Sequence, residues 1–141
     1  MDIFESKLDD ALGRLDLKHV KSVVAAIQSG NCWLLGLSSA RDDRQHKWCF
    51  PGGHLRPNEA YANGVERETK EETGIRCKAG IKPILIPSKP DVLFLHCKAS
   101  KDQRLVPNKE FIILGWFDTA QMKGLKLHQN VLQIINKIQR R

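Results

Sequence analysis

Apolar and polar positions recur along the chain with two different periods, and each period predicts a type of element. Apolar residues at near-helical spacing between positions 3 and 15 predict an N-terminal helix within residues 1–18. The same spacing returns at residues 127–138, which predicts a closing helix. Stretches rich in β-branched and aromatic residues, separated by turns, predict strands at residues 19–28, 32–37, 47–50, 77–86, 92–98 and 110–117.

A third helix is predicted in the middle of the chain, and it differs from the others in its carboxylates. Glu68, Glu71 and Glu72 stand at i, i+3 and i+4, so three acidic side chains project from neighbouring positions. Glu72 falls within the apolar arc of this helix, where a carboxylate is costly unless it lines a cleft or holds a cation. A hard divalent cation such as Mg²⁺ takes oxygen ligands and would relieve the repulsion.

Glycine and turn residues mark the borders of this helix. Pro51, Gly52 and Gly53 predict a sharp bend with unusual backbone angles and a close approach of the backbone to a ligand. The side chain of Asn58 is expected to cap the first turn, and Gly74 to end the helix in a left-handed conformation. Within the helix, Gly64 predicts that another chain segment or a ligand comes close.

Residues 53–75 read GHLRPNEAYANGVERETKEETGI and resemble the Nudix box, G-x5-E-x7-R-E-U-x-E-E-x-G-U, in which U is a bulky apolar residue. Thr69 departs from the pattern at one U position, which weakens packing but removes no charged group. The positions that match are Gly53, Glu59, Arg67, Glu68, Glu71, Glu72, Gly74 and Ile75.

The resemblance implies an α+β fold, the Nudix-type α/β/α sandwich with a mixed β-sheet between helices. The order of the predicted elements fits this fold from about residue 19 to residue 141. We therefore expect residues 1–141 to form a single Nudix domain, with residues 53–75 as its loop-helix-loop motif.

The resemblance also implies a metal site. Glu68 and Glu72 are similar to the direct ligands of the family, Glu71 to a ligand or to the base that activates water, and the carbonyl of Gly52 to the backbone ligand. In many relatives a further base or ligand comes from outside the box, and Glu110 is the candidate here, against the alternative of an ordinary acid at a strand edge. The expected cofactor is Mg²⁺, with Mn²⁺ as a substitute.

Other residues of interest have supporting or substrate-binding roles in this interpretation. Arg67 can pair with Glu71 or Glu59 and hold the carboxylates in register, so Arg67 and Glu59 are expected to support the metal ligands. Arg41 and Arg44 precede the box and are candidates for the terminal phosphates of a substrate. His54 could also contact phosphate, although a solvated loop histidine is the more common case.

The activity implied by the resemblance is hydrolysis of a nucleoside diphosphate linked to a group X, which gives a nucleoside monophosphate and X-phosphate or pyrophosphate. The tyrosine that dinucleoside polyphosphate hydrolases often carry after the box is absent, because Tyr61 is the only tyrosine and lies within it. Nucleoside triphosphates and ADP-sugars such as ADP-ribose are almost equally favoured as the substrate. RNA decapping and nucleotide binding without catalysis remain as alternatives.

Composition and charge narrow the class of protein, its cellular compartment and its partner. The 141 residues, 41% hydrophobic and 28% charged, suit one globular domain, and no apolar run reaches the roughly 18 residues of a membrane span. The four cysteines form no C-x-x-C pair, and the acidic N-terminus does not resemble a secretory signal, so a cytoplasmic protein is expected. The net charge of +7 is dispersed, so a small nucleotide is favoured over nucleic acid as the partner, in a monomer or homodimer.

Overall fold

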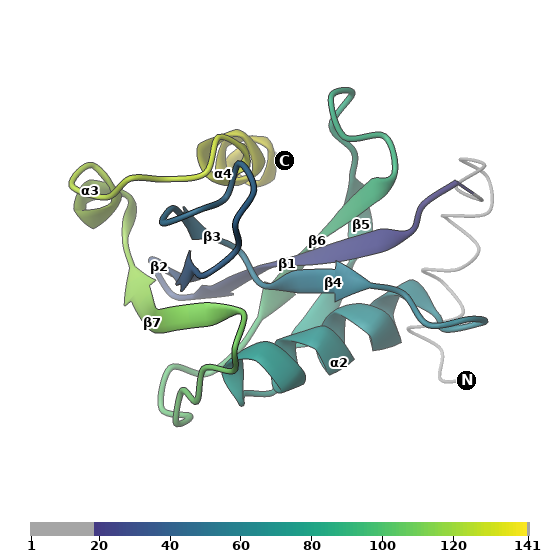
Figure 1. Ribbon diagram of the computed structural model, residues 1–141, viewed down its shortest axis with the longest axis horizontal. Helices are drawn as coiled ribbons and strands as arrows, with labels where there is room; N and C mark the ends of the chain where they lie inside the picture. Colours follow the sequence, from purple (N-terminus) through teal and green to yellow (C-terminus); the bar gives the residue numbers. More distant parts are fainter. Residues whose placement is uncertain (1–18, 141) are drawn as a thin grey trace.

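The computed structural model of the protein describes residues 19–140. These residues form a mixed seven-stranded sheet with helices on both faces (Figure 1). The N-terminal helix predicted within residues 1–18 lies outside the described residues, and the assignment of residues 1–141 to one domain stays a prediction. The strands are β1 (Ser22–Ser29), β2 (Cys32–Ser38), β3 (Trp48–Cys49), β4 (Gly52–His54), β5 (Lys78–Ile84), β6 (Val92–Lys98) and β7 (Phe111–Phe117). The helices are α2 (Tyr61–Thr73), α3 (Thr119–Met122) and α4 (Asn130–Gln139).

Strand β1 is the centre of the sheet. It pairs in parallel with β6 and antiparallel with β2 and β4. Outward from these, β5 pairs antiparallel with β6, and β2 pairs antiparallel with β3 and β7. The predicted mixed sheet between helices is therefore confirmed.

Apolar side chains fill both faces of the sheet because helices cover both. Strand β1 shows the alternation: Val23, Ala25 and Ile27 belong to the cluster beneath α2, whereas Ala26 belongs to the cluster beneath α4. Helix α4 contributes an apolar stripe to the second cluster, formed by Val131, Ile134, Ile135 and Ile138. None of the helices in the described part of the chain has the length and apolar character that a membrane crossing requires.

The start of α2 differs from the prediction. Asn58 does not cap the helix, because it adopts a left-handed backbone conformation with φ of 61° two residues before the N-cap position. Helix α2 begins at Tyr61, and its N-cap residue is Ala60, which has no side-chain acceptor. The end of the helix is as predicted: Gly74 has φ of 80°, and its N–H donates to the carbonyl of Lys70.

Gly52 and Gly53 lie in strand β4, and neither has the positive φ expected of a sharp bend. Glycine is needed here for space instead. A Cβ on Gly52 would lie 2.5 Å from the carbonyl oxygen of Val23, and a Cβ on Gly53 would collide with the carboxylate of Glu68. A side chain at Gly52 would therefore separate β4 from β1, whereas a side chain at Gly53 would displace the carboxylate of Glu68 on α2. Gly64 serves the same purpose, since its Cβ would lie 2.6 Å from Leu55 Cδ2.

The closing helix, predicted at residues 127–138, begins later in the structure, because α4 starts at Asn130. Residues 126–128 are not helical, because they run alongside β3: Trp48 N–H donates to the Lys126 carbonyl at 2.8 Å and His128 N–H to the Trp48 carbonyl at 2.9 Å. In strand β7, Ile112 and Ile113 are 56% and 51% exposed. Within the described sheet, β7 pairs only with β2.

Candidate active site

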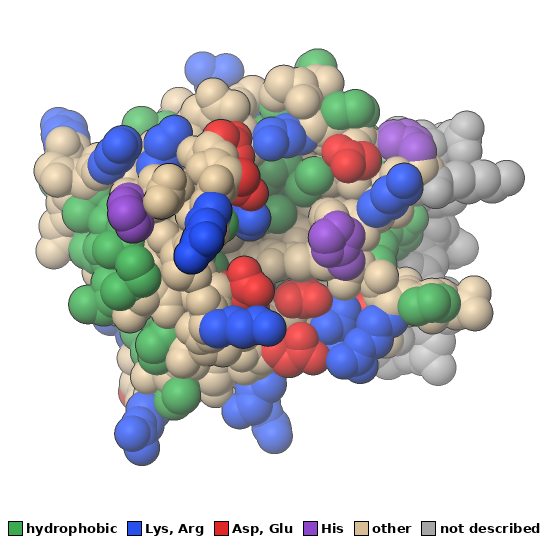
Figure 2. All heavy atoms as spheres, viewed as in Figure 1, with side chains coloured by type: hydrophobic (Ala, Val, Ile, Leu, Met, Phe, Trp, Pro, Cys, Tyr) green, Lys and Arg blue, Asp and Glu red, His purple; other side chains and the backbone are tan. Residues whose placement is uncertain are grey.

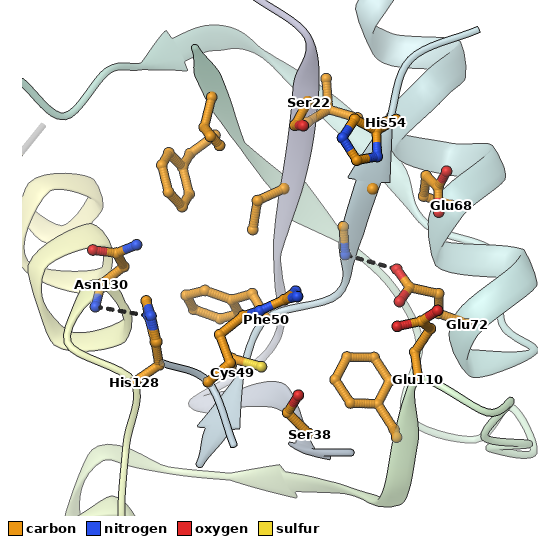
Figure 3. A pocket seen from close by; sticks show the side chains of 18 of the residues that line it. Ser22, Ser38, Cys49, Phe50, His54, Glu68, Glu72, Glu110, His128 and Asn130 are labelled. Atoms are coloured by element: carbon orange, nitrogen blue, oxygen red, sulfur yellow. Dashed lines mark hydrogen bonds between the residues drawn. The ribbon is translucent and has the colours of Figure 1, made fainter. Parts of the chain in front are cut away.

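A cavity of about 840 Å³ opens between the α2–β4 side of the sheet and the start of α4 (Figure 3). Its lining includes Glu68, Glu71, Glu72 and Glu110, and Figure 2 shows acidic side chains gathered at a hollow of this face, with lysine and arginine side chains around them. We call these four carboxylates, together with the neighbouring backbone of Gly52 and Gly53, the acidic wall. The carboxylates predicted from the sequence are thus brought to one side of one pocket.

Arg67 connects the carboxylates of this wall. Its guanidinium donates to both oxygens of Glu59, at 2.7 and 2.9 Å, to Glu68 at 2.9 Å and to Glu71 at 3.1 Å. Its Nη2 also donates to the carbonyl oxygen of His54 at 3.1 Å, which ties α2 to the end of β4. The planar fork of an arginine suits such a set of partners, whereas a lysine could not match it.

Hydrogen bonds in this network favour its charged state. The pKa of Arg67 is raised above its usual value, first by the hydrogen bonds that it donates to Glu59 and then by the one that it donates to Glu68, against an opposing effect of burial. The pKa of Glu59 is lowered, mainly by its hydrogen bonds with Arg67. The side chains of Arg67 and Glu59 are only 17% and 13% exposed, so solvent screens this pair weakly.

Glu72 stands apart from the arginine. It is 5% exposed, and its Oε1 accepts a hydrogen bond of 2.8 Å from the N–H of Gly52. Burial raises the pKa of Glu72 to about 8, and the negative charges of Glu68 and Glu110 add to the shift, while the Gly52 hydrogen bond opposes it. In the described residues no lysine or arginine forms an ion pair with Glu72. A cation in the pocket would favour its ionised form.

The carbonyl of Gly52 also faces the acidic wall. The carbonyl of the preceding residue, Pro51, accepts from Ala25 of β1, and Gly53 pairs with Val23 of β1. Because the N–H and C=O of one strand residue leave the same edge, the carbonyl of Gly52 points to the side on which its N–H meets Glu72. This orientation makes it available as an oxygen ligand.

Glu110 reaches the site from the segment that precedes β7. Figure 3 shows its carboxylate directed toward that of Glu72, and its charge contributes to the raised pKa of Glu72. Its backbone is held on two sides: its N–H is bonded to the side chain of Asn108 at 2.8 Å, and its carbonyl accepts from the N–H of Ser39 at 3.0 Å. Glu110 therefore adds a carboxylate from outside the helix.

The donor set suits a hard divalent cation, since it consists of carboxylate and carbonyl oxygens, and such an ion would offset the negative charges of Glu68 and Glu110 that raise the pKa of Glu72. The side chains are not yet arranged around a single point: within residues 19–140, no three acidic, histidine or cysteine side chains converge as metal ligands. Glu68 and Glu71 are drawn toward Arg67 instead. Metal binding would therefore require carboxylates to rotate.

Of the three basic residues predicted to bind phosphate, two line the pocket and one does not. Arg44 lines the pocket, although Asp42 holds its guanidinium at 2.9 Å. His54 also lines the pocket and is exposed. Arg41 is exposed but is not part of the lining, so the structure gives it no place in the site.

Sequence reasoning missed three residues. Arg56 donates to Glu71 at 3.1 Å, which gives that carboxylate a second arginine partner. His128 and Asn130 line the pocket opposite the acidic wall and are 5% and 9% exposed. The available signal was the presence of two polar residues within a segment whose apolar positions follow a helical period.

Comparisons with known proteins place this geometry in context. A model described as the NUDIX domain matches residues 18–137. The CTP pyrophosphohydrolase of Escherichia coli (strain K12) is 33% identical over 64 residues, which are 45% of this chain and 47% of that protein. The match thus spans about half the length of that curated relative.

Two solved structures show the same fold. A C. elegans Ap4A hydrolase in a binary complex has a TM-score of 0.67 at 20% identity, over 84% of this chain and 96% of that chain. A bifunctional NMN adenylyltransferase/ADP ribose pyrophosphatase from Francisella tularensis, complexed with AMP and a manganese ion, has a TM-score of 0.66 at 16% identity, over 97% and 46%. At these identities the likeness concerns the fold alone.

Proposed function

The chain belongs to the NUDIX domain family, and on that premise we propose that it hydrolyses the diphosphate link of a nucleotide with the help of a divalent cation. The observation that carries the proposal is the state of Glu72. The ionised form of a carboxyl that is 5% exposed, beside a large pocket and with the negative charges of Glu68 and Glu110 acting on it more strongly than the positive charge of Arg44, is unfavourable unless a cation binds there.

Glu68, Glu72, Glu110 and the carbonyl of Gly52 would hold the ion, which we expect to be Mg²⁺, with Mn²⁺ as a substitute. When bound, such an ion neutralises charge on the diphosphate and lowers the pKa of a coordinated water. Phosphoryl transfer asks a protein mainly for position and charge stabilisation, and carboxylates that turn toward one ion beside a pocket would provide both.

The remaining side chains keep this wall in place or handle the proton. Arg67 joins Glu59, Glu68 and Glu71, so it sets the direction in which these carboxylates point. Glu71 and Glu110 are the candidates to accept the proton of the attacking water. Both oxygens of Glu71 are engaged by arginines, Oε1 by Arg56 and Oε2 by Arg67, so we favour Glu110, which has no ion pair among the described residues.

Nucleoside triphosphates are the substrates that we place first, with a nucleoside monophosphate and pyrophosphate as products. The E. coli relative is named for hydrolysis of CTP, and a cavity of about 840 Å³ lies within the range of roughly 300–1,000 Å³ typical of small-molecule sites. Arg44 and His54 at the pocket are suited to phosphate oxygens. An ADP-sugar is the second candidate, because the F. tularensis neighbour is described as an ADP ribose pyrophosphatase and is complexed with AMP.

The test is a product analysis. The purified protein is incubated with Mg²⁺ and a panel of nucleoside and deoxynucleoside triphosphates, ADP-sugars, dinucleoside polyphosphates and capped RNA, and products are identified by chromatography and ³¹P NMR. We expect release of a nucleoside monophosphate from at least one triphosphate, and none after chelation of the metal. Tight, metal-independent nucleotide binding with no product would instead indicate a non-catalytic binding protein.

A further inference from the structure

The segment that leads into β7 is attached to the C-terminal end of α2. The N–H of Val106 donates to the carbonyl of Thr73 at 2.8 Å, and the N–H of Asn108 donates to the carbonyl of Glu72 at 3.4 Å. The last carbonyls of a helix have no partner within the helix, so this segment supplies partners that α2 lacks. The backbone of Asn108 is thereby joined to that of Glu72, the buried carboxylate of the acidic wall.

The side chain of Asn108 closes a tight turn around the backbone of Glu110. Its Oδ1 accepts the N–H of Glu110 at 2.8 Å, and its carbonyl accepts the N–H of Phe111 at 3.3 Å. An asparagine side chain that bonds the N–H two residues later in the chain forms an Asx-turn. Phe111 begins β7 and is 7% exposed, so the far end of the turn is anchored in the sheet. Asn108 therefore connects α2 to the backbone that carries the carboxylate of Glu110.

A second contact holds the same main chain from the loop that follows β2. The N–H of Ser39 donates to the carbonyl of Glu110 at 3.0 Å, and its hydroxyl donates to the carbonyl of Lys109 at 2.5 Å. These bonds engage only the backbone of Glu110, and its carboxylate forms no ion pair among the described residues. The direction of that carboxylate therefore depends on where the backbone of residues 108–110 lies.

The carboxylates of Glu72 and Glu110, which Asn108 connects through the backbone, repel each other. Figure 3 shows the carboxylate of Glu110 directed toward that of Glu72, and its negative charge is one cause of the raised pKa of Glu72. Without a restraint, this repulsion would favour a backbone position that takes Glu110 away from Glu72. The turn at Asn108 is such a restraint, because it fixes the N–H of Glu110.

We propose that Asn108 is a positioning residue of the acidic wall, which keeps the backbone of Glu110 beside α2 so that the carboxylates of Glu72 and Glu110 can turn toward one divalent cation. This inference rests on the proposed function. Asn108 acts through the N–H of Glu110 and needs no contact of its own with the ion or the nucleotide.

Binding of Mn²⁺ alone, followed by electron paramagnetic resonance, tests the inference without turnover. Asn108→Ala removes the acceptor of the Glu110 N–H, and we expect it to raise the Kd for Mn²⁺ by about 10-fold or more, as the loss of groups that orient metal ligands commonly does. It should remain folded, because its backbone bonds to Glu72 and Phe111 are kept and the lost bond is exposed. Asn108→Ser retains a hydroxyl that can accept the same N–H, and it should recover most of the affinity.

Gln103→Ala is the control in the same loop. The Gln103 side chain accepts the N–H of Arg76 at 2.8 Å and donates to the carbonyl of Arg76 at 2.9 Å, so it also fixes the loop through side-chain bonds to backbone. Neither bond involves Glu110. We expect Gln103→Ala to lower the urea midpoint of unfolding, while its Kd for Mn²⁺ stays within about twofold of the unaltered protein.

The outcomes separate this inference from the proposed function. If Asn108→Ala binds Mn²⁺ as the unaltered protein does, if Asn108→Ser binds it as weakly as Asn108→Ala, or if Gln103→Ala weakens binding equally, Asn108 is not a positioning residue, although the proposed hydrolase survives. The same holds if the unaltered protein releases a nucleoside monophosphate but binds no Mn²⁺. If it neither binds Mn²⁺ nor hydrolyses any nucleotide, both proposals are wrong.

Discussion

Arg67 holds Glu59 through two parallel hydrogen bonds, from Nε to Oε2 at 2.7 Å and from Nη2 to Oε1 at 2.9 Å. This contact joins the loop before α2 to the middle of the helix, eight residues later in the chain. Glu59 also accepts the backbone N–H of Arg56 at 3.1 Å, so the loop is closed on the helix from both ends. The orientation of the acidic wall therefore depends on one guanidinium.

Replacement of Arg67 should lower stability as well as activity. Arg67→Ala leaves Glu59 and Glu68 partly buried without their counter-charge, and we expect the free energy of unfolding to fall by about 3 kcal/mol in urea denaturation. Arg67→Lys should recover only part of this loss, because an ammonium group cannot make the paired hydrogen bonds to Glu59.

Asp42→Asn provides the control for that experiment. Asp42 and Arg44 are also joined by several hydrogen bonds, and these lower the pKa of Asp42 to about 2, yet their side chains are 53% and 47% exposed. Solvent screening limits such pairs to roughly 0–1 kcal/mol. Equal losses of stability in Arg67→Ala and Asp42→Asn would show that burial of the Arg67 network contributes nothing.

Gly53→Ala should impair function more than folding. The added Cβ would collide with the carboxylate of Glu68, which is the end of a flexible side chain and can turn away while Arg67 keeps its hydrogen bonds to Glu59 and Glu71. Turning away removes it from the acidic wall. We expect the metal-dependent rate to fall by about 10-fold or more, with the midpoint of thermal unfolding nearly unchanged.

Gly124→Ala is the matched substitution for Gly53→Ala. A Cβ at Gly124 would meet its nearest neighbour, the carbonyl oxygen of Gln121, at an ordinary 3.7 Å. Its rate should equal that of the unaltered protein. A Gly53→Ala protein with full activity would mean that the contact between β4 and Glu68 does not matter for the site.

The raised pKa of Glu72 predicts a specific pH dependence of stability. Because the folded protein holds this proton up to about pH 8, whereas an unfolded chain releases it near the ordinary glutamate pKa of 4.5, the folded state binds more protons between these values. The contribution of Glu72 is fully present below about pH 4.5 and is lost as pH rises toward 8. The metal-free protein should therefore lose stability, by up to a few kcal/mol, across this interval.

Glu72→Gln isolates this contribution. The amide does not titrate, so the difference in unfolding free energy between the two proteins, measured in the presence of a chelator from pH 5 to pH 9, should move in favour of the variant as pH rises. If the difference is independent of pH, the carboxyl of Glu72 is not buried in its neutral form. Added Mg²⁺ at pH 8 should stabilise the unaltered protein and not the variant.

Much of the fold followed from local patterns. A run rich in β-branched residues predicted the strand that contains Val23 and Ile27, as expected where both faces of a strand are covered, and Gly74 ended α2 because a left-handed residue completes that cap. The start of α2 was missed, since Asn58 is a good cap by type but is held in a left-handed turn. A residue's preference does not reveal which of two allowed local structures it adopts.

The residues of the candidate site were likewise predictable from the sequence only in part. Glu68, Glu71 and Glu72 could be found because they belong to one helix, where sequence spacing fixes direction. Asn130 and His128 could not, since their approach to the pocket depends on the pairing of residues 126–128 with β3 and on the packing of α4 against the sheet. Likewise, Gly52 and Gly53 were predicted to allow a ligand close to the backbone, but the neighbours that they accommodate in the structure, β1 and the Glu68 side chain, became known only from the pairing of β4 with β1 and its packing on α2.

The central claim is that carboxylates of α2 hold a divalent cation that makes a nucleotide diphosphate link breakable, and one comparison tests it most directly. The rate of nucleoside monophosphate release is measured with Mg²⁺ for the unaltered protein, Glu68→Gln, Glu72→Gln and, as a control on the same helix, Glu66→Gln, each shown to be folded by circular dichroism. We predict that Glu68→Gln and Glu72→Gln lose several orders of magnitude in rate while Glu66→Gln keeps its activity. Near-normal rates in both Glu68→Gln and Glu72→Gln would contradict the account.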